Sequence, residues 1–152
     1  MLTPEDVLAL LPQKAPFRFV DRLTTIDEHR ASGEYTFRPD EFFYRGHFPG
    51  DPVTPGVILI ETMCQTGLVA FGIYLLGLEV PREEVARTVT LFTESEVEFE
   101  RIVRPGETVR VAAEKVFWRR RKLRSRVVLT LADGTPVAKG TVAGMGVRRD
   151  GT

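Results

Sequence analysis

The longest apolar stretch of the chain runs from Val57 to Leu78 and predicts a buried helix. It is long enough to cross a bilayer, but Glu61 and Gln65 lie in its first half, and a carboxylate is costly in lipid. Thr54 as N-cap and Pro55 at the first helical position predict where the helix begins. We therefore expect a helix inside the protein and not a membrane span.

The segments around this helix favour extended structure, apart from a short helix predicted for residues 4–11. Before the long helix, residues 17–23 are expected to be extended, residues 26–37 predict a strand with a bulge at Gly33, and residues 38–54 predict a structured loop. After it, five segments rich in Val, Thr, Leu and Phe predict strands: 87–93, 96–101, 108–117, 122–131 and 136–146. Turn signals lie at 104–107 and 132–135, and the second predicts a hairpin.

One long apolar helix followed by consecutive strands indicates the fold class. Such a helix must bury nearly its whole circumference, and a curved antiparallel sheet wrapped around it does this. The sequence therefore predicts an α+β arrangement in a single domain over residues 1–152. Val97 and Phe99 alternate with glutamates, which predicts one buried face and one wet face for their strand.

Composition narrows the classes of function. Lys and Arg number 21, and so do Asp and Glu, so the formal net charge is zero and favours neither nucleic acid nor a membrane surface. Cys64 is the single cysteine, which excludes an intrachain disulfide, and two distant histidines give no zinc-binding spacing. We expect no metal and no cofactor. The absence of a signal peptide pattern, with one cysteine, favours the cytoplasm.

The residues suited to chemistry lie within 41–65. His47 stands in the Gly- and Pro-rich loop, Glu61 lies near the start of the apolar helix, and Gln65 shares the face of Glu61 four residues later. A buried carboxyl tends to have a raised pKa and can serve as a general acid, while histidine suits a general base. Amides at the helix start, near Gly56 and Val57, are placed to polarise a carbonyl oxygen.

Each of these features also has a plainer interpretation. A loop histidine is usually a surface or structural residue, and His29 is given no role on that ground. Glu61 and Gln65 also fit a structural hydrogen-bonded pair. Local chemistry alone names no substrate.

The segment GHFPGDPVTPGVILIETMCQ (46–65) resembles the signature of the FabZ-type 3-hydroxyacyl-ACP dehydratases, GHFPxxPVMPGVLxxExMAQ. The segments LLPQKAPFRFVDRL (10–23) and VEFERIVRPGETV (97–109) are also similar to family motifs. The resemblance implies that His47 is the catalytic histidine and Glu61 the catalytic carboxylate. It implies that Gln65 supports the site and that the Gly56 amide faces the thioester carbonyl.

The resemblance further implies a hot-dog fold and a cofactor-free lyase that converts (3R)-3-hydroxyacyl-ACP to trans-2-enoyl-ACP. The substrate would be carried on the phosphopantetheine of an acyl carrier protein, in fatty-acid, polyketide or polyene biosynthesis. Family members form homodimers, with the histidine of one subunit facing the carboxylate of the other, and many form trimers of dimers.

Some positions depart from the family motif. Thr54 replaces the usual Met before Pro-Gly, Cys64 replaces the usual Ala, and Lys14 and Ala15 differ from the opening motif. FabA-type relatives, which also isomerise the product, have Asp at the position of Glu61. The glutamate in this chain therefore favours dehydration alone. The departures leave the acyl chain length and the pathway open.

A basic run, WRRRKLRSR, spans residues 118–126. An acidic carrier protein would be attracted to such a run. The residues expected to contribute are Arg119, Arg120, Arg121, Lys122 and Arg124. A solvated strand edge blunted by charge is the alternative for each residue, and nucleic-acid binding is less favoured because the run is short.

Two other functions remain open from the sequence. A hot-dog thioesterase would use a carboxylate to activate water for hydrolysis of the thioester. A non-catalytic hot-dog subunit would bind acyl chains or assemble a larger synthase. The presence of both His47 and Glu61 favours the dehydratase over either.

Overall fold

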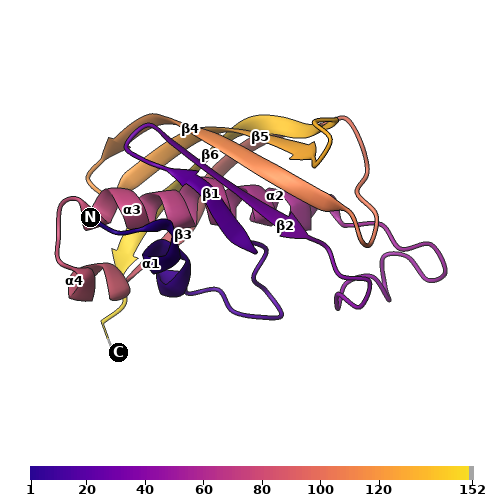
Figure 1. Ribbon diagram of the computed structural model, residues 1–152, viewed down its shortest axis with the longest axis horizontal. Helices are drawn as coiled ribbons and strands as arrows, with labels where there is room; N and C mark the ends of the chain where they lie inside the picture. The colour runs from indigo at the N-terminus through magenta and orange to yellow at the C-terminus, as the bar shows by residue number, and fades with distance from the viewer. Residues whose placement is uncertain (151–152) are drawn as a thin grey trace.

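The computed structural model describes residues 1–150 and consists of a six-stranded antiparallel sheet curved over one long helix (Figure 1). The strand order across the sheet is β1-β2-β4-β5-β6-β3. The strands are β1 (Arg22–Ile26), β2 (Arg30–Thr36), β3 (Thr88–Phe99), β4 (Thr108–Arg119), β5 (Lys122–Leu131) and β6 (Pro136–Arg148). This arrangement confirms the predicted α+β, hot-dog-like fold.

The central helix has three consecutive parts, α2 (Gly56–Cys64), η1 (Gln65–Ala70) and α3 (Phe71–Gly77). The stretch Gly56–Gly77 is long and apolar enough to span a membrane, but 72% of its most apolar window is buried within the fold. It is the core helix of the domain, as predicted. The middle part, η1, is a π-helix, which the apolar pattern did not predict.

Small residues let the π-helix approach the sheet closely. A Cβ built at Gly67 would lie 3.0 Å from Val127 Cγ2, so the helix backbone rests directly on β5. The buried Ser125 hydroxyl, also on β5, donates to the Gly67 carbonyl at 2.7 Å. On β2, a Cβ at Gly33 would lie 2.9 Å from Thr66 Oγ1. Glycine at these positions sets the distance between the two layers.

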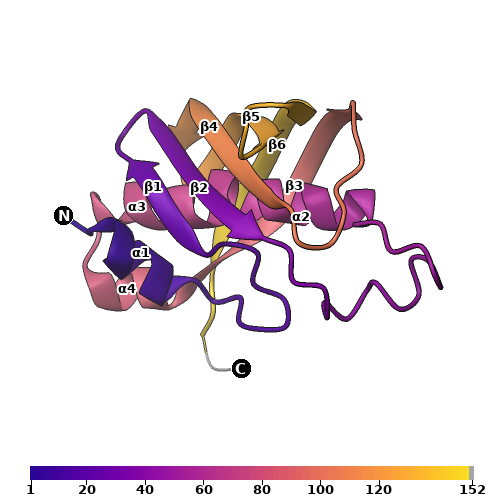
Figure 2. The same cartoon turned by 45° about the vertical axis from the view of Figure 1, so that its right-hand side comes forward.

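The remaining elements close the two ends of the helix. α1 (Pro4–Leu10) has a capping box between Thr3 and Asp6, and α4 (Arg82–Ala86) follows the central helix; both lie below the sheet near the α3 end (Figure 2). The loop between β2 and α2 extends beyond the opposite end of the sheet, at the start of α2 (Figures 1 and 2). The short first helix and the structured loop were predicted, whereas α4 was not.

Three local predictions were wrong. Residues 26–37 do not form one strand, because a turn at 27–29 separates β1 from β2, and the bulge lies in β1 opposite Gly33. Segments 87–93 and 96–101 form one strand, β3, with a bulge between Phe92 and Glu94. Phe99 is 46% exposed and not buried.

The β3–β6 pairing depends on the absence of a side chain at Gly140. A Cβ there would lie 1.9 Å from Glu96 O, which the paired strands cannot accommodate without separating. We expect Gly140→Ala to lower the free energy of unfolding by about 3 kcal/mol or more. Gly72→Ala is the matched control, since its Cβ meets Thr90 Oγ1 at an ordinary 3.7 Å.

Because alanine favours the helix over glycine, we expect Gly72→Ala to raise the free energy of unfolding by about 0.5–1 kcal/mol. Urea unfolding of both variants and the wild type measures the difference. Equal stability of Gly140→Ala and the wild type would contradict the close approach.

Candidate active site

The loop between β2 and α2 holds His47 through reciprocal bonds with one residue. The Val53 amide donates to His47 O at 2.9 Å, and His47 Nδ1 lies 2.8 Å from Val53 O. Phe48 and Asp51 close the turn between them with two backbone hydrogen bonds of 3.0 and 2.9 Å. Gly50 adopts φ +76°, a left-handed conformation that favours glycine.

This contact determines the tautomer of His47. A carbonyl oxygen only accepts hydrogen bonds, so Nδ1 carries the proton in the bond to Val53 O. Nε2 then has a free lone pair, and a neutral imidazole with a free Nε2 can act as a base. The Phe48 ring stacks on the imidazole with 4.0 Å between ring centroids and restricts its rotation.

The start of α2 presents two amides. The Ile58 and Leu59 amides both donate to Pro55 O, at 2.9 and 3.1 Å. The amides of Gly56 and Val57 belong to the first helical turn, whose N–H groups have no partner within the helix. Val57 is 73% exposed, so its surroundings are open. These amides can therefore donate hydrogen bonds to an anion or to a polarised carbonyl oxygen.

The N-cap prediction for Thr54 was wrong. The N-cap is Pro55, without a side-chain cap, and the Thr54 hydroxyl instead forms a hydrogen bond of 2.7 Å with the Tyr44 hydroxyl. The N–H of Thr54 donates to Val103 O at 2.9 Å. Thr54 therefore fastens the loop to its surroundings and leaves the helix N-terminus open.

Gln65 fixes the orientation of Glu61. The Phe19 amide donates to Gln65 Oε1 at 2.7 Å, so the Gln65 Nε2 group must point the other way. Nε2 donates to Phe17 O at 3.0 Å and to Glu61 Oε2 at 2.9 Å. The predicted hydrogen bond between Glu61 and Gln65 is therefore present. Because Oε2 accepts this bond, Oε1 of Glu61 is the oxygen left to carry a proton.

The surroundings of Glu61 favour its neutral form. Burial raises the pKa of the Glu61 carboxyl, and the hydrogen bond from Gln65 lowers it by a smaller amount. Burial likewise raises the pKa of the Cys64 thiol, with a smaller contribution from Glu61, so Cys64 stays a thiol and not a nucleophilic thiolate. Glu61 thus has the environment of a general acid.

His47 and Glu61 do not meet within the described chain. The side-chain hydrogen bonds given for them go to Val53 O and to Gln65, respectively, and no hydrogen bond or ion pair joins the two. The structure brings Glu61 together with Gln65, and His47 together with the residues that precede Gly56. It leaves His47 and Glu61 without a hydrogen bond between them. No cluster of three metal-ligating side chains occurs within residues 1–150.

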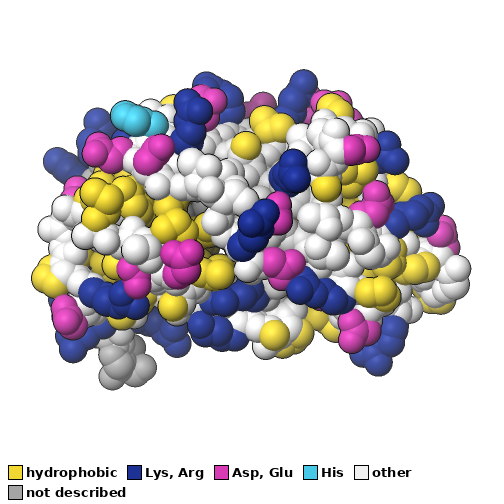
Figure 3. All heavy atoms as spheres, in the orientation of Figure 1, with side chains coloured by type: hydrophobic (Ala, Val, Ile, Leu, Met, Phe, Trp, Pro, Cys, Tyr) yellow, Lys and Arg dark blue, Asp and Glu magenta, His cyan; other side chains and the backbone are white. Residues whose placement is uncertain are grey.

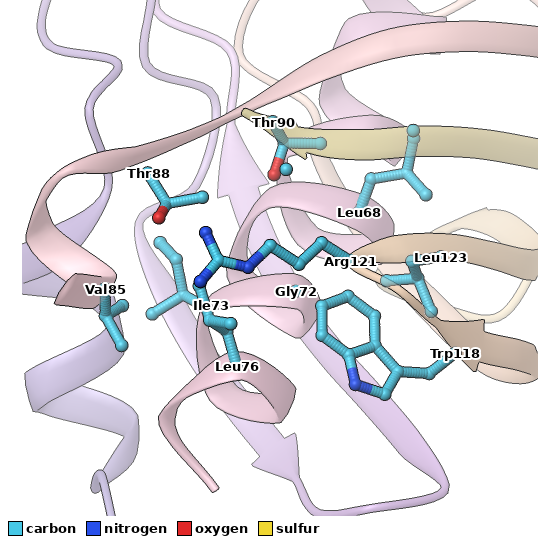
Figure 4. A pocket seen from close by; sticks show the side chains of 12 residues that line it. Leu68, Gly72, Ile73, Leu76, Val85, Thr88, Thr90, Trp118, Arg121 and Leu123 are labelled. Carbon is cyan, nitrogen blue, oxygen red and sulfur yellow. The ribbon is translucent and has the colours of Figure 1, made fainter. Parts of the chain in front are cut away.

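A small, partly open pocket lies at the far end of the central helix (Figure 4). Its walls are mostly apolar, and Arg121 crosses it with its side chain reaching toward Thr88. Glu84 pairs with Arg121 at 3.2 Å, which neutralises this charge. Neither His47 nor Glu61 lines the pocket, so it is separate from the acid–base residues.

The basic run lies at the same far end. Arg120 and Arg121 form a two-residue turn between β4 and β5, with φ values of 52° and 64°. Glu94 pairs with Lys122 at 3.2 Å and with Arg124 at 2.6 Å. Three of the five predicted docking residues are therefore paired with acids, whereas Arg119 and Arg120 are exposed. On the face in Figure 3, acidic and basic side chains are interspersed.

Comparisons with known proteins identify the family of the chain. Residues 11–142 match the model of the FabA-like domain family. The chain is 39% identical over 141 residues to the 3-hydroxyacyl-[acyl-carrier-protein] dehydratase FabZ of Herpetosiphon aurantiacus, covering 92% of this chain and 94% of that protein. The FabZ of Chloroflexus aggregans is 35% identical over 134 residues, with 88% of each covered. The chain belongs to the FabZ-type dehydratase family.

Solved structures confirm the fold of this FabZ-type chain. The dehydratase heterocomplex ApeI:P from Xenorhabdus doucetiae aligns with a TM-score of 0.78 at 13% identity, covering 98% of this chain and 94% of that one. A thioesterase from Haemophilus influenzae aligns with a TM-score of 0.67 at 13% identity, covering 98% and 93%. At this identity the likeness establishes the hot-dog fold alone.

The sequence did not reveal the residues whose hydrogen bonds orient Gln65, Thr54 and His47. Phe17 and Phe19 orient Gln65 through backbone groups, so their identity carried no signal. Tyr44 binds Thr54 through its hydroxyl, and its position three residues before His47 was the available indication. Val53 acts through its carbonyl, which no residue type reveals.

Burial of Glu61 predicts that the stability of the folded chain depends on pH. Because its pKa is raised in the folded state, the folded chain binds this proton more tightly than the unfolded chain. The resulting stabilisation is present below the unfolded pKa and is lost as pH rises through the folded pKa. We expect Glu61→Gln to raise Tm by a few degrees at neutral pH, with the gain shrinking as pH falls through the folded pKa and absent below the ordinary glutamate pKa of 4.5.

Differential scanning calorimetry across this pH range makes the comparison. The exposed Glu114 provides the control, because Glu114→Gln removes a solvated carboxylate from the outer face of β4. A Glu61→Gln protein that is no more stable than the wild type at neutral pH would contradict the desolvation of Glu61.

Proposed function

We propose that this FabZ-type protein removes water from a (3R)-3-hydroxyacyl thioester to give the trans-2-enoyl thioester, with His47 as general base and Glu61 as general acid. The observation that carries the proposal is the state of Glu61. It is a desolvated carboxyl with one oxygen held by Gln65 and the other left free, five residues into a helix whose first amides are open.

The proposed reaction moves one proton at each residue. Nε2 of His47 takes the proton from C2, and the electron pair of that C–H bond forms the double bond between C2 and C3. The C3–O bond breaks, and Glu61 gives its proton to the departing hydroxyl, which leaves as water. The Gly56 amide, with Val57 beside it, polarises the thioester carbonyl and stabilises the enolate-like charge on its oxygen.

The separation of acid and base within one chain favours a shared site in a homodimer. β3 is a 12-residue strand at the edge of the sheet, and Leu91, Phe92 and Phe99 on it are about half exposed. A long, exposed edge strand with half-exposed apolar side chains invites pairing with another chain. We propose that a second copy pairs with β3, bringing His47 of one subunit to Glu61 of the other, and that trimers of dimers form by further contacts.

Antiparallel pairing of two β3 edges would also place the basic run. The turn at Arg120 lies at the Thr88 end of β3, whereas Gly56 contacts Phe99 at the other end. A two-fold axis near the middle of β3 brings these ends together across the interface. We propose that Arg119 and Arg120, with the paired Arg121, Lys122 and Arg124, then lie where an acidic acyl carrier protein approaches the site. A cytoplasmic enzyme without a cofactor accords with this chemistry.

The rival reading is a thioesterase, because solved thioesterases share this fold. A hydrolase would need an ionised carboxylate that activates water, whereas burial raises the pKa of Glu61 above its ordinary value, which suits a proton donor better. Non-catalytic acyl binding would leave no role for a base held as the Nδ1–H tautomer at His47.

The proposal predicts the product and the effect of two substitutions. With 3-hydroxyacyl carrier substrates of graded chain length, we expect enoyl thioester and no free thiol from the wild type. Because general acid–base groups contribute about 10²–10⁴-fold, His47→Ala and Glu61→Gln should each lose activity by about that factor. Mass spectrometry of the products decides, since free acid with free thiol indicates a thioesterase. Full activity in both variants would overturn the assignment.

Mixing the two inactive variants tests whether the site is shared. If His47 and Glu61 face each other across the interface, a hybrid of a His47→Ala chain and a Glu61→Gln chain contains one intact site and one doubly altered site. Co-refolding at equal amounts makes about half of the dimers hybrids, so about a quarter of wild-type activity should return. A site built within one chain would regain none. Each variant co-refolded with itself is the control.

A further inference from the structure

A buried pair of hydroxyl groups spans the His47 loop. Tyr44 and Thr54 are 5% and 3% exposed, and their hydroxyl oxygens lie 2.7 Å apart. Thr54 stands where the family motif has Met, which needs no hydrogen-bond partner. A buried threonine hydroxyl does need one, and Tyr44 supplies it. We call this hydrogen bond the Tyr44–Thr54 clamp.

The clamp encloses the contacts that hold the imidazole. His47 and Val53 lie between its two ends and exchange two hydrogen bonds, from the Val53 amide to His47 O and from His47 Nδ1 to Val53 O. Val53 and Thr54 share a peptide group, and that group contains the Val53 carbonyl. The N–H of the same group donates to Val103 O. The plane of the peptide is therefore set by Val103 on one side and by the side chain of Thr54 on the other.

We propose that the clamp positions the Val53 carbonyl and thereby selects the Nδ1–H tautomer of His47. Tyr44 and Thr54 are positioning residues in this scheme, since they act through Val53 and touch neither substrate nor the imidazole. The catalytic consequence rests on the proposed function, because it requires His47 Nε2 to be the base. The structural consequence, a fixed tautomer, does not.

The chemistry of the pair makes the clamp sensitive to the loss of either hydroxyl. Burial raises the pKa of the Tyr44 phenol, so it stays protonated and able to donate. Removing one hydroxyl leaves the other buried without this partner, and it must then turn toward another polar group or water. Removing both with apolar groups of similar shape leaves no unpaired group. The two single substitutions and the double substitution therefore distinguish a hydrogen bond from simple packing.

The first measurement needs no activity. His29 and His47 are the two histidines of the chain, so ¹⁵N-histidine labelling gives two imidazole spectra, and the exposed His29 is an internal reference. In the wild type, recorded where the rings are neutral, we expect the Nδ1–H tautomer to dominate at His47. In Tyr44→Phe and Thr54→Val we expect a mixture of the two tautomers. Thr54→Ser keeps the hydroxyl and should keep the wild-type tautomer.

The second measurement is the dehydration rate. We expect Tyr44→Phe and Thr54→Val each to lower kcat about tenfold with little change in KM, as is common for partners that orient a functional imidazole. Thr54→Ser should recover most of the rate. The double variant should lose less than the product of the two single losses. Tyr74→Phe, which alters a buried tyrosine on α3, is the matched control.

Two outcomes overturn the proposal. One is a wild-type tautomer ratio at His47 in both single variants, whatever happens to the rate. The other is a changed tautomer with unchanged kcat, which would remove the catalytic role of the clamp. A wild type that releases no enoyl product would refute the proposed function instead, and the tautomer measurement would still decide whether the clamp acts on His47.

Discussion

The buried side-chain amide of Gln65 connects the parts of the site on which the chemistry of Glu61 depends. Its oxygen accepts from the Phe19 amide, and its nitrogen donates to Phe17 O and Glu61 Oε2. Because an amide has a distinct donor end and acceptor end, the two backbone contacts leave a single orientation. One residue therefore ties the segment before β1 to the central helix and decides which carboxylate oxygen is occupied. A leucine of similar size would fill the space but make none of these three hydrogen bonds.

The helix can present Gln65 in this way because its geometry changes there. The π-helix begins at Gln65, directly after the α-helical turn that carries Glu61. The Ser125 hydroxyl, on the sheet, donates a hydrogen bond to one of its carbonyl groups, that of Gly67. π-Helical turns are rare and frequent at functional sites. Gly67 brings the same turn against Val127, so the sheet supports the irregular segment from the opposite side to Phe17. Gly67 and Ser125, which set the distance between the helix and the sheet, therefore also support the π-helix that carries Gln65.

The sequence predicted what depends on side-chain type and spacing. Val57 to Leu78 marked the core helix, the boundaries of β5 were found, and the spacing of Glu61 and Gln65 gave their hydrogen bond. Features that depend on the backbone were not predictable: the π-helix, the continuity of β3 through its bulge, and the Val53 carbonyl. Thr54 shows why a local rule can fail. Threonine before Pro-Gly is a good helix cap, but the hydroxyl of Thr54 forms its hydrogen bond with the buried Tyr44 hydroxyl and not with the helix.

Two features of the described chain call for the same partner. His47 and Glu61 are held separately, each by its own hydrogen bonds. At the same time the edge strand β3 leaves Leu91 and Phe99 half exposed, and Phe99 packs on Gly56 at the start of the helix. A surface that buries this edge therefore also lies against the start of the helix. Under the proposed function, pairing of two β3 edges would bury apolar area and bring His47 of one subunit to Glu61 of the other in one step.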